Sequence, residues 1–151
     1  MTPEEAEALA HRWHATIGEV RVGGQAIRED PARLGELLAP DAVAHVNGQE
    51  FRGVEAAGQL ASALRTAFPD ARIEHHEALA VGERVAIRWS CTGTQRGEYF
   101  GVPGSGRPVD FEGLDLFHLR GGRLAELWIE YDNLGVMQQI GALPAPGQAA
   151  S

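Results

Sequence analysis

The chain has 151 residues, of which 44% are hydrophobic and 23% are charged, and its formal net charge is −8 at pH 7. These values are typical of one soluble globular domain, and the excess of acidic residues disfavours nucleic acid or an anionic membrane as a partner. The single cysteine, Cys91, excludes a disulfide within the chain, and no Cys/His cluster has the spacing of a zinc site. We therefore expect no bound metal. Because residues 2–5 lack the basic and apolar segments of a signal peptide, we expect a cytoplasmic protein.

The first half of the chain predicts helices and one short strand. Residues 2–17 carry apolar side chains at helical spacing, and Thr2 and Glu5 match a capping box at the start of that helix. Prolines and small polar residues mark where the elements end. The predicted elements are a helix over 2–17, a helix over 31–38, a strand over 42–46 and a helix over 53–67.

The second half of the chain predicts strands. Apolar and polar residues alternate through four segments, and Gly121 and Gly122 mark a tight turn between the last two. A loop rich in glycine and proline separates two hairpins. The predicted strands cover 71–80, 84–94, 109–119 and 124–132, the loop covers 97–108, and a short helix or turn covers 134–140.

This order of elements predicts an α+β fold, in which helices pack on one face of a strongly curved, mixed or antiparallel sheet. We expect a single domain over residues 1–141, followed by a disordered tail over 142–151 that is rich in Ala, Pro and Gly. A sheet that curls around a helix leaves a hollow at its open end. Such a hollow is the default ligand site.

The last predicted hairpin carries the strongest candidate site. Side chains alternate along a strand, so a two-residue turn at Gly121 and Gly122 would bring aromatic and acidic side chains together on one face. The expected pairs are Phe117 with Glu126, Asp115 with Trp128, Gly113 with Glu130, and Phe111 with Asp132. Burial between rings and mutual repulsion raise the pKa of a carboxyl group towards the range useful for acid/base catalysis. The alternative is a solvated face that carries ordinary surface acids.

Three stretches carry a resemblance to a known family: 93–103 with the sequence GTQRGEYFGVP, 113–117 with GLDLF, and 121–141. Together they resemble the SnoaL-like polyketide cyclases, also called ester cyclases. The resemblance covers roughly residues 30–141. One departure is Leu127, because members of the family often carry a histidine at that place.

The resemblance implies a cone-shaped fold of the nuclear transport factor 2-like superfamily, assembled as a homodimer or homotetramer. It also implies ring closure of a small hydrophobic or aromatic substrate by intramolecular aldol condensation, without a cofactor and with Asp132 as the acid/base. Asp115 and His45 are the further catalytic candidates. The side chains that we expect to contact substrate are Trp13, His14, Asn47, Arg88, Tyr99, Phe111, Phe117, Trp128 and Glu130.

Several of these roles have alternatives. Asn47 and Tyr99 could polarise a substrate carbonyl, whereas Asn47 could equally be a turn residue before Gly48. Arg88 could bind a substrate carboxylate or pair with an acid on the neighbouring strand. Two other functions also fit the residues: an epoxide-opening cyclase or hydrolase, which needs two acidic groups, and a binding protein that catalyses nothing.

Overall fold

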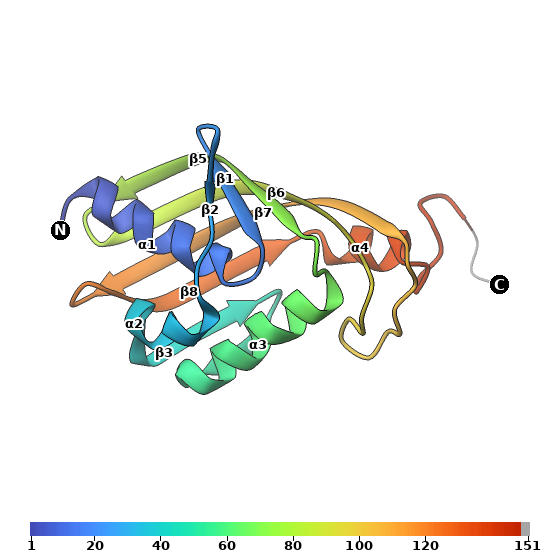
Figure 1. Cartoon of the computed structure of the whole chain (residues 1–151), viewed down its shortest axis with the longest axis horizontal. Coiled ribbons are helices and arrows are strands. Elements are labelled where there is room, and N and C mark those ends of the chain that lie inside the picture. Colours follow the sequence, from blue (N-terminus) through green and yellow to red (C-terminus); the bar gives the residue numbers. More distant parts are fainter. Residues whose placement is uncertain (149–151) are drawn as a thin grey trace.

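A computed structural model describes residues 1–148 of the chain. Helices dominate the first half and strands the second (Figure 1). In chain order the elements are α1 (Pro3–Ala15), β1 (Glu19–Val22), β2 (Gln25–Ile27), a 3₁₀ turn (Pro31–Arg33), α2 (Leu34–Leu37), β3 (Leu38–Val46), β4 (Gln49–Arg52), α3 (Gly53–Ala67), β5 (Arg72–Val81), β6 (Arg84–Thr94), β7 (Pro108–Arg120), β8 (Arg123–Tyr131) and α4 (Asn133–Gln139).

The long predicted elements are confirmed, and α3 and β6 have the predicted bounds. The capping box of α1 is present, because the Thr2 side chain accepts a hydrogen bond from the Glu5 N–H and the Glu5 carboxylate accepts one from the Thr2 N–H. The predicted helix over 31–38 is shorter than expected. Its last residue, Leu38, is already the first residue of β3.

The strands form one mixed sheet in the order β2-β1-β5-β6-β7-β8-β3-β4. Two neighbouring pairs are parallel, β1 with β5 and β3 with β8, and the other pairs are antiparallel. The sequence did not predict β1, β2 or β4, which have three or four residues each and lie towards the two edges of the sheet. Strands that short show too little alternation to be recognised.

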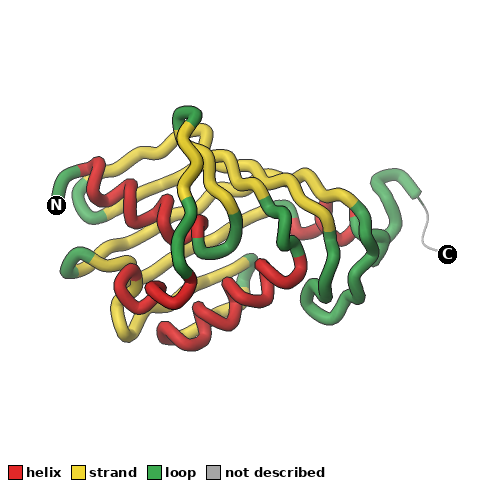
Figure 2. Tube along the Cα trace, in the orientation of Figure 1, coloured by secondary structure: helices red, strands yellow, loops and turns green. Residues whose placement is uncertain are grey.

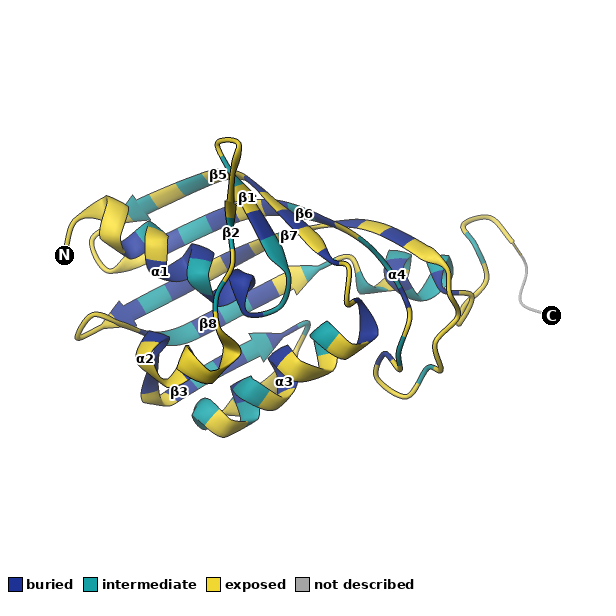
Figure 3. Ribbon diagram, in the orientation of Figure 1, coloured by how far each residue is buried: buried dark blue, intermediate teal, exposed yellow. Residues whose placement is uncertain are grey.

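Helices α1, α2 and α3 lie against one face of the sheet, and α4 follows β8 at the far end (Figures 1 and 2). The buried residues are concentrated between this helical layer and the inner face of the sheet (Figure 3). No helix within residues 1–148 is long and apolar enough to cross a bilayer. The core therefore lies between one layer of helices and one sheet, as the α+β prediction requires.

The turn between β7 and β8 has the predicted two residues, but the predicted pairing beyond it is wrong. Gly121 and Gly122 both have positive φ, which suits this tight turn, and Arg120 pairs with Arg123 as expected. A β-bulge follows: Leu119 pairs with Leu124, whereas the next pair is His118 with Glu126. One extra residue in β8 shifts every later pair by one position.

The bulge separates side chains that the sequence had placed together. Asp115 pairs with Ile129 rather than Trp128, and Phe117 pairs with Leu127 rather than Glu126. On the inner, buried face β7 therefore contributes its aromatic residues and Asp115, while β8 contributes apolar residues. The acidic side chains of β8 lie on the outer face.

The segment after α4 begins attached to that helix. The N–H groups of Ala142 and Leu143 both donate to the carbonyl oxygen of Met137, at 2.9 and 3.2 Å. The predicted disordered tail therefore starts with two anchored residues. Its last residues, 149–151, lie outside the described part of the chain.

Candidate active site

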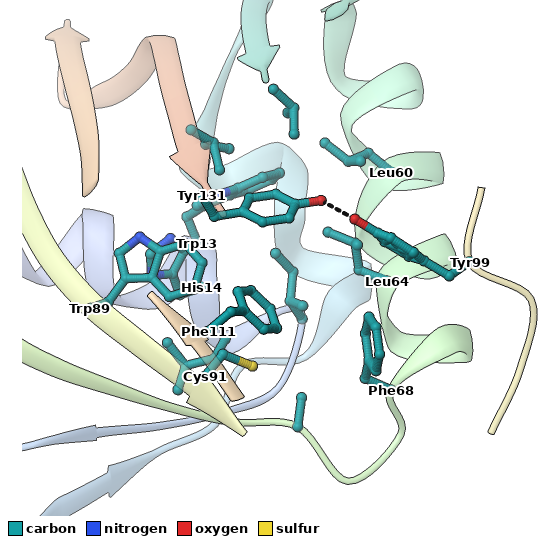
Figure 4. Close-up of a pocket in the computed structure, with 15 residues that line it drawn as sticks. Trp13, His14, Leu60, Leu64, Phe68, Trp89, Cys91, Tyr99, Phe111 and Tyr131 are labelled. Atoms are coloured by element: carbon teal, nitrogen blue, oxygen red, sulfur yellow. Dashed lines mark hydrogen bonds between the residues drawn. The ribbon is translucent and has the colours of Figure 1, made fainter. Parts of the chain in front are cut away.

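An apolar cavity of about 50 Å³ lies between α1, α3 and the inner face of the sheet. Figure 4 shows Leu60 and Leu64 of α3 on one side of it and His14 and Trp89 on the other. Its wall is almost entirely apolar or aromatic. The lining residues are Trp13, His14, Ile17, Val46, Leu60, Leu64, Phe68, Ala71, Ile73, Trp89, Cys91, Tyr99, Phe111, Ile129 and Tyr131.

A buried histidine–carboxylate pair lies at the edge of this cavity. His14 comes from α1 and Asp115 from β7, and their Nε2 and Oδ2 atoms are 2.5 Å apart. The other carboxylate oxygen, Oδ1, accepts a hydrogen bond of 2.9 Å from Trp89 Nε1. Asp115 is 1% exposed and His14 is 2% exposed. Because both carboxylate oxygens accept hydrogen bonds, the ionised form of Asp115 is satisfied inside an apolar region.

Two more histidines extend this pair away from the cavity. His14 Nδ1 is 2.6 Å from His75 Nε2, and His75 Nδ1 is 2.6 Å from His11 Nδ1. Burial, followed by the neighbouring histidines, lowers the pKa of His75 to about 2, and burial also lowers the pKa of His11. Both rings are therefore neutral at physiological pH.

Two tyrosines close the other end of the cavity. The hydroxyl groups of Tyr99 and Tyr131 are hydrogen-bonded, as the dashed line in Figure 4 marks, with their oxygens 2.6 Å apart. The Tyr99 hydroxyl also donates to Asn133 Oδ1. Beyond them lies a second hollow of about 250 Å³, which shares Val46 and both tyrosines with the first cavity. Burial raises the pKa of both phenols, so they remain protonated donors.

Two further groups in the cavity wall bear on its chemistry. Trp13 Nε1 is a buried hydrogen-bond donor with no partner among residues 1–148. Such orphan donors are rare and invite an acceptor from a ligand or a water. Burial raises the pKa of the Cys91 thiol to about 12, so this cysteine stays protonated and is a poor nucleophile.

The structure brings several of the predicted residues to this site. Trp13, His14, Tyr99 and Phe111, four of the predicted substrate contacts, line the cavity. Asp115 lies directly behind His14. Phe117 is fully buried with its ring centroid 6.0 Å from that of His14, so it supports the wall without lining the cavity.

The predicted position of Asp132 inside the pocket is wrong. Its side chain is exposed and caps helix α4, where Oδ1 accepts a hydrogen bond of 2.9 Å from the Gly135 N–H. The cause is parity: Asp132 follows the outward-facing Trp128 and Glu130 at even spacing, and the bulge turns that row away from Asp115. Asp132 borders an open groove on the outer side of the sheet.

Three other predicted contacts also lie on the outer face, outside the cavity. Glu130 is exposed, and Arg88 is exposed and donates from Nε to Glu77 Oε1 at 2.9 Å, which is the structural pairing considered above. The ring of Trp128 is stacked on that of His45, with centroids 5.2 Å apart.

His45 and Asn47 are also displaced from their predicted roles. His45 is half-buried beside Trp128, and its Nε2 is 2.7 Å from Glu126 Oε2, so it does not line the cavity. Asn47 lies at the outer hollow beyond the tyrosines. Its Oδ1 accepts a hydrogen bond from the Tyr131 N–H at 3.0 Å, and its φ of 47° is that of a turn residue.

Sequence reasoning missed four residues at this site: His11, His75, Trp89 and Tyr131. A signal for one of them, His11, was present, because His11 and His14 are three positions apart and therefore share one face of α1. Residues 1–148 contain no group of three or more His, Cys, Asp or Glu side chains that could hold a metal ion.

Comparisons with known proteins agree with this fold. A SnoaL-like protein from Jannaschia Sp. CCS1, a proposed polyketide cyclase, has a TM-score of 0.78 and 24% identity, over 95% of this chain and 98% of that one. AclR from Streptomyces galilaeus, a proposed hydroxylase, has a TM-score of 0.77 and 24% identity, over 97% and 87%. IdmH from Streptomyces antibioticus, a proposed polyketide cyclase, has a TM-score of 0.69 and 28% identity, over 93% and 99%.

No curated protein sequence matches the chain. The predicted cone-shaped α+β fold of the nuclear transport factor 2-like type is confirmed by the mixed sheet, its helical layer and these structural matches. The family model described as SnoaL-like polyketide cyclase matches residues 24–140. The chain therefore belongs to the SnoaL-like polyketide cyclase family.

Proposed function

We propose that the protein is an acid/base enzyme that enolises and cyclises a small aromatic or polyketide-like ketone, with the His14–Asp115 pair as its proton-transfer group. The observation that carries this proposal is the pair itself, buried at the edge of an apolar cavity with its atoms 2.5 Å apart. Asp115 is the one buried carboxylate among the described residues. Buried titratable groups beside a cavity are the usual form of an acid/base site.

The hydrogen bonds define how the pair holds its proton. When Asp115 is ionised, its two oxygens accept from Trp89 Nε1 and from His14 Nε2. His14 then has a lone pair on Nδ1, which accepts from His75 Nε2. A carboxylate oxygen has two lone pairs, so Asp115 keeps a free lone pair on each oxygen. Asp115, held by His14, can take a proton from an acidified carbon of the ligand and return it to the oxygen that becomes negative during ring closure.

The cavity also supplies a donor for the ligand's oxygen. Trp13 Nε1 is buried, lacks a partner and belongs to a residue of the wall. A carbonyl oxygen that accepted this hydrogen bond would be polarised, which makes the neighbouring carbon more acidic. The Tyr99 hydroxyl donates to Asn133 Oδ1, and the Tyr131 hydroxyl then donates to the Tyr99 oxygen, so Trp13 offers the free donor.

A ligand of this class needs more room than the cavity provides in this structure. About 50 Å³ holds only a few waters, whereas small-molecule sites commonly measure about 300–1,000 Å³. The outer hollow of about 250 Å³ shares its wall with the cavity at Tyr99 and Tyr131. Separation of these two rings would join the spaces, so we propose that the ligand enters between them.

The structure disfavours epoxide opening by the residues first considered for it. That reaction needs an acid and a base on opposite sides of one ligand. Asp132 and Glu130 lie on the outer face, so neither can assist Asp115 across the cavity.

The proposal is tested by enolisation of a model compound. Benzoylacetone, an aromatic diketone, converts slowly between its keto and enol forms, and ultraviolet absorbance follows the conversion. We expect the protein to accelerate it and His14→Gln to reduce the acceleration by about 100-fold, which is typical of the loss of an acid/base group.

The matched control is His45→Gln. His45 also contacts a carboxylate, Glu126, but on the outer face of the sheet, and its replacement should leave the rate unchanged. If benzoylacetone binds without any acceleration, the protein is a binding protein for such compounds. Equal losses in both variants would contradict the assignment to the cavity.

A further inference from the structure

The histidine chain connects two separate hollows of the molecule. His14 lines the apolar cavity, whereas His11 and His75 line a hollow of about 230 Å³ between α1, β1 and β5. Acid/base chemistry at the cavity requires only His14 and Asp115. That chemistry therefore leaves His11 and His75 without a role.

The histidine chain is continuous and buried along its whole length. Three contacts of 2.5, 2.6 and 2.6 Å join Asp115 to His14, His14 to His75, and His75 to His11. The three histidines are at most 9% exposed. Because no contact in the chain exceeds hydrogen-bond distance, a proton can pass along it without a bridging water.

The N–H groups of the three histidines can all donate in the same direction along the histidine chain. With Asp115 ionised, His14 donates from Nε2, His75 donates from Nε2 to His14 Nδ1, and His11 donates from Nδ1 to His75 Nδ1. Each ring is then neutral with one donor and one acceptor. The remaining acceptor is His11 Nε2, which has no partner among the described residues and is not a fully buried atom.

We propose that His11, His75 and His14 form a proton relay that connects Asp115 with solvent in the hollow between α1 and β5, while a ligand fills the cavity. This inference rests on the proposed function, because it supplies and removes the proton that the His14–Asp115 pair transfers.

Each step of the relay balances. A proton from water binds His11 Nε2, and the Nδ1 proton of His11 passes to His75 Nδ1. The Nε2 proton of His75 passes to His14 Nδ1, and the Nε2 proton of His14 passes to Asp115 Oδ2. Every ring gains one proton and loses one, and the net result is one proton moved from solvent to Asp115. The reversed sequence carries a proton from Asp115 back to solvent and restores the first arrangement.

The residues around His11 in this hollow favour the uptake of a proton from solvent. Glu7 of α1 also lines the hollow, and its negative charge attracts protons towards His11. Glu77 of β5 lines the hollow too, but its charge is paired with Arg88. His76 is the other titratable group there, and its Nε2 is bonded to Ser90 Oγ at 2.8 Å, outside the chain. The pKa of His75 is lowered to about 2, chiefly by burial, so the middle ring passes a proton on without storing it.

The relay is tested by the rate at which the buried Nε2 proton of His14 exchanges with water. This measurement needs no substrate. The rate is measured by nuclear magnetic resonance, from transfer of saturation between water and the Nε2 proton of His14. His11→Asn retains a donor near the position of Nδ1 but cannot be protonated. We expect it to slow exchange by at least about tenfold, because exchange then requires local opening of a buried ring.

His76→Asn is the matched control, since it removes a histidine from the same hollow but not from the chain, and it should exchange as the wild type does. An unchanged rate in His11→Asn would overturn the relay. If that variant does not fold, the wild type decides: exchange through the hollow should rise with the concentration of a buffer acid such as imidazole, and a rate independent of buffer would overturn the relay.

These outcomes are independent of the enolisation test. Slow exchange in His11→Asn together with no enolisation would support the relay and contradict the proposed function. Normal exchange together with a loss of enolisation in His14→Gln would contradict the relay alone.

Discussion

The inner and outer faces of the sheet carry similar residues in opposite states. On the inner face, Asp115 is 1% exposed and accepts hydrogen bonds from His14 and Trp89. On the outer face, Asp132 is exposed and caps a short helix. Both are aspartates in or next to the last hairpin. Their difference teaches that burial and partners, rather than residue type or position near the end of a strand, select the candidate catalytic group.

Two neighbouring histidines of β5 differ in the same way as the two aspartates. His75 is buried within the histidine chain, whereas His76, the next residue, is exposed and contacts Ser90. Successive residues of a strand point to opposite faces, so a single step along the chain changes the environment completely.

The largest expected effect on stability comes from a substitution at Gly113, on the inner face of the sheet. A Cβ atom there would lie 2.2 Å from Trp89 Cζ2 and 2.9 Å from the Glu130 carbonyl oxygen. Trp89 must move to make room, and it then leaves Asp115 without one of its donors. We expect Gly113→Ala to lower the free energy of unfolding by about 3 kcal/mol, measured by urea denaturation.

The control for that prediction is the same substitution where there is space. In α3 a Cβ atom at Gly58 would have only Leu34 Cδ2 nearby, at 3.7 Å. Gly58→Ala should therefore be neutral or raise stability by up to about 1 kcal/mol, because alanine favours a helix interior. If Gly113→Ala were equally well tolerated, Trp89 would not be fixed against β7 as described.

A smaller effect concerns pH and distinguishes His75 from His76. The pKa of His75 falls from 6.5 to about 2 on folding, mainly through burial. Below pH 6.5 the unfolded chain therefore binds a proton that the folded protein does not, so stability falls as the pH falls. From pH 7.5 to pH 5 this histidine alone should cost about 2 kcal/mol, and His11, whose pKa is also lowered, adds to the loss.

Urea denaturation at the two pH values measures this loss. His75→Gln should reduce the dependence on pH, because glutamine does not titrate, whereas His76→Gln should leave it as in the wild type. Identical pH dependence in wild type and His75→Gln would show that the ring is not held neutral by burial.

Much of the fold followed from local sequence patterns. The capping box at Thr2 and Glu5, the helical spacing of α3 and the Gly121–Gly122 turn each predicted an element that is present. These features depend on residues close together in the chain. The cavity wall was predicted in part for the same reason, since Trp13 and His14 lie on the helix expected to cover the sheet.

The centre of the site could not be predicted in the same way. A bulge of one residue near Ala125 decides which side chains of β8 face Asp115. Its trace in the sequence is a single step of three residues, from Leu124 to Leu127, in a strand whose inward residues otherwise alternate by two. The histidine chain depends on contacts between residues more than 60 positions apart, such as His14 with His75. Such contacts arise only when α1 packs on the sheet.

The most direct test of the account compares the two aspartates in the benzoylacetone assay. Asp115→Asn keeps the size of the side chain but cannot hold the negative charge between His14 and Trp89. Asp132→Asn keeps a side chain that caps helices well. We predict that Asp115→Asn lowers the enolisation rate by at least about 100-fold, and that Asp132→Asn changes it by less than about twofold. A large loss in Asp132→Asn with an active Asp115→Asn would contradict the account.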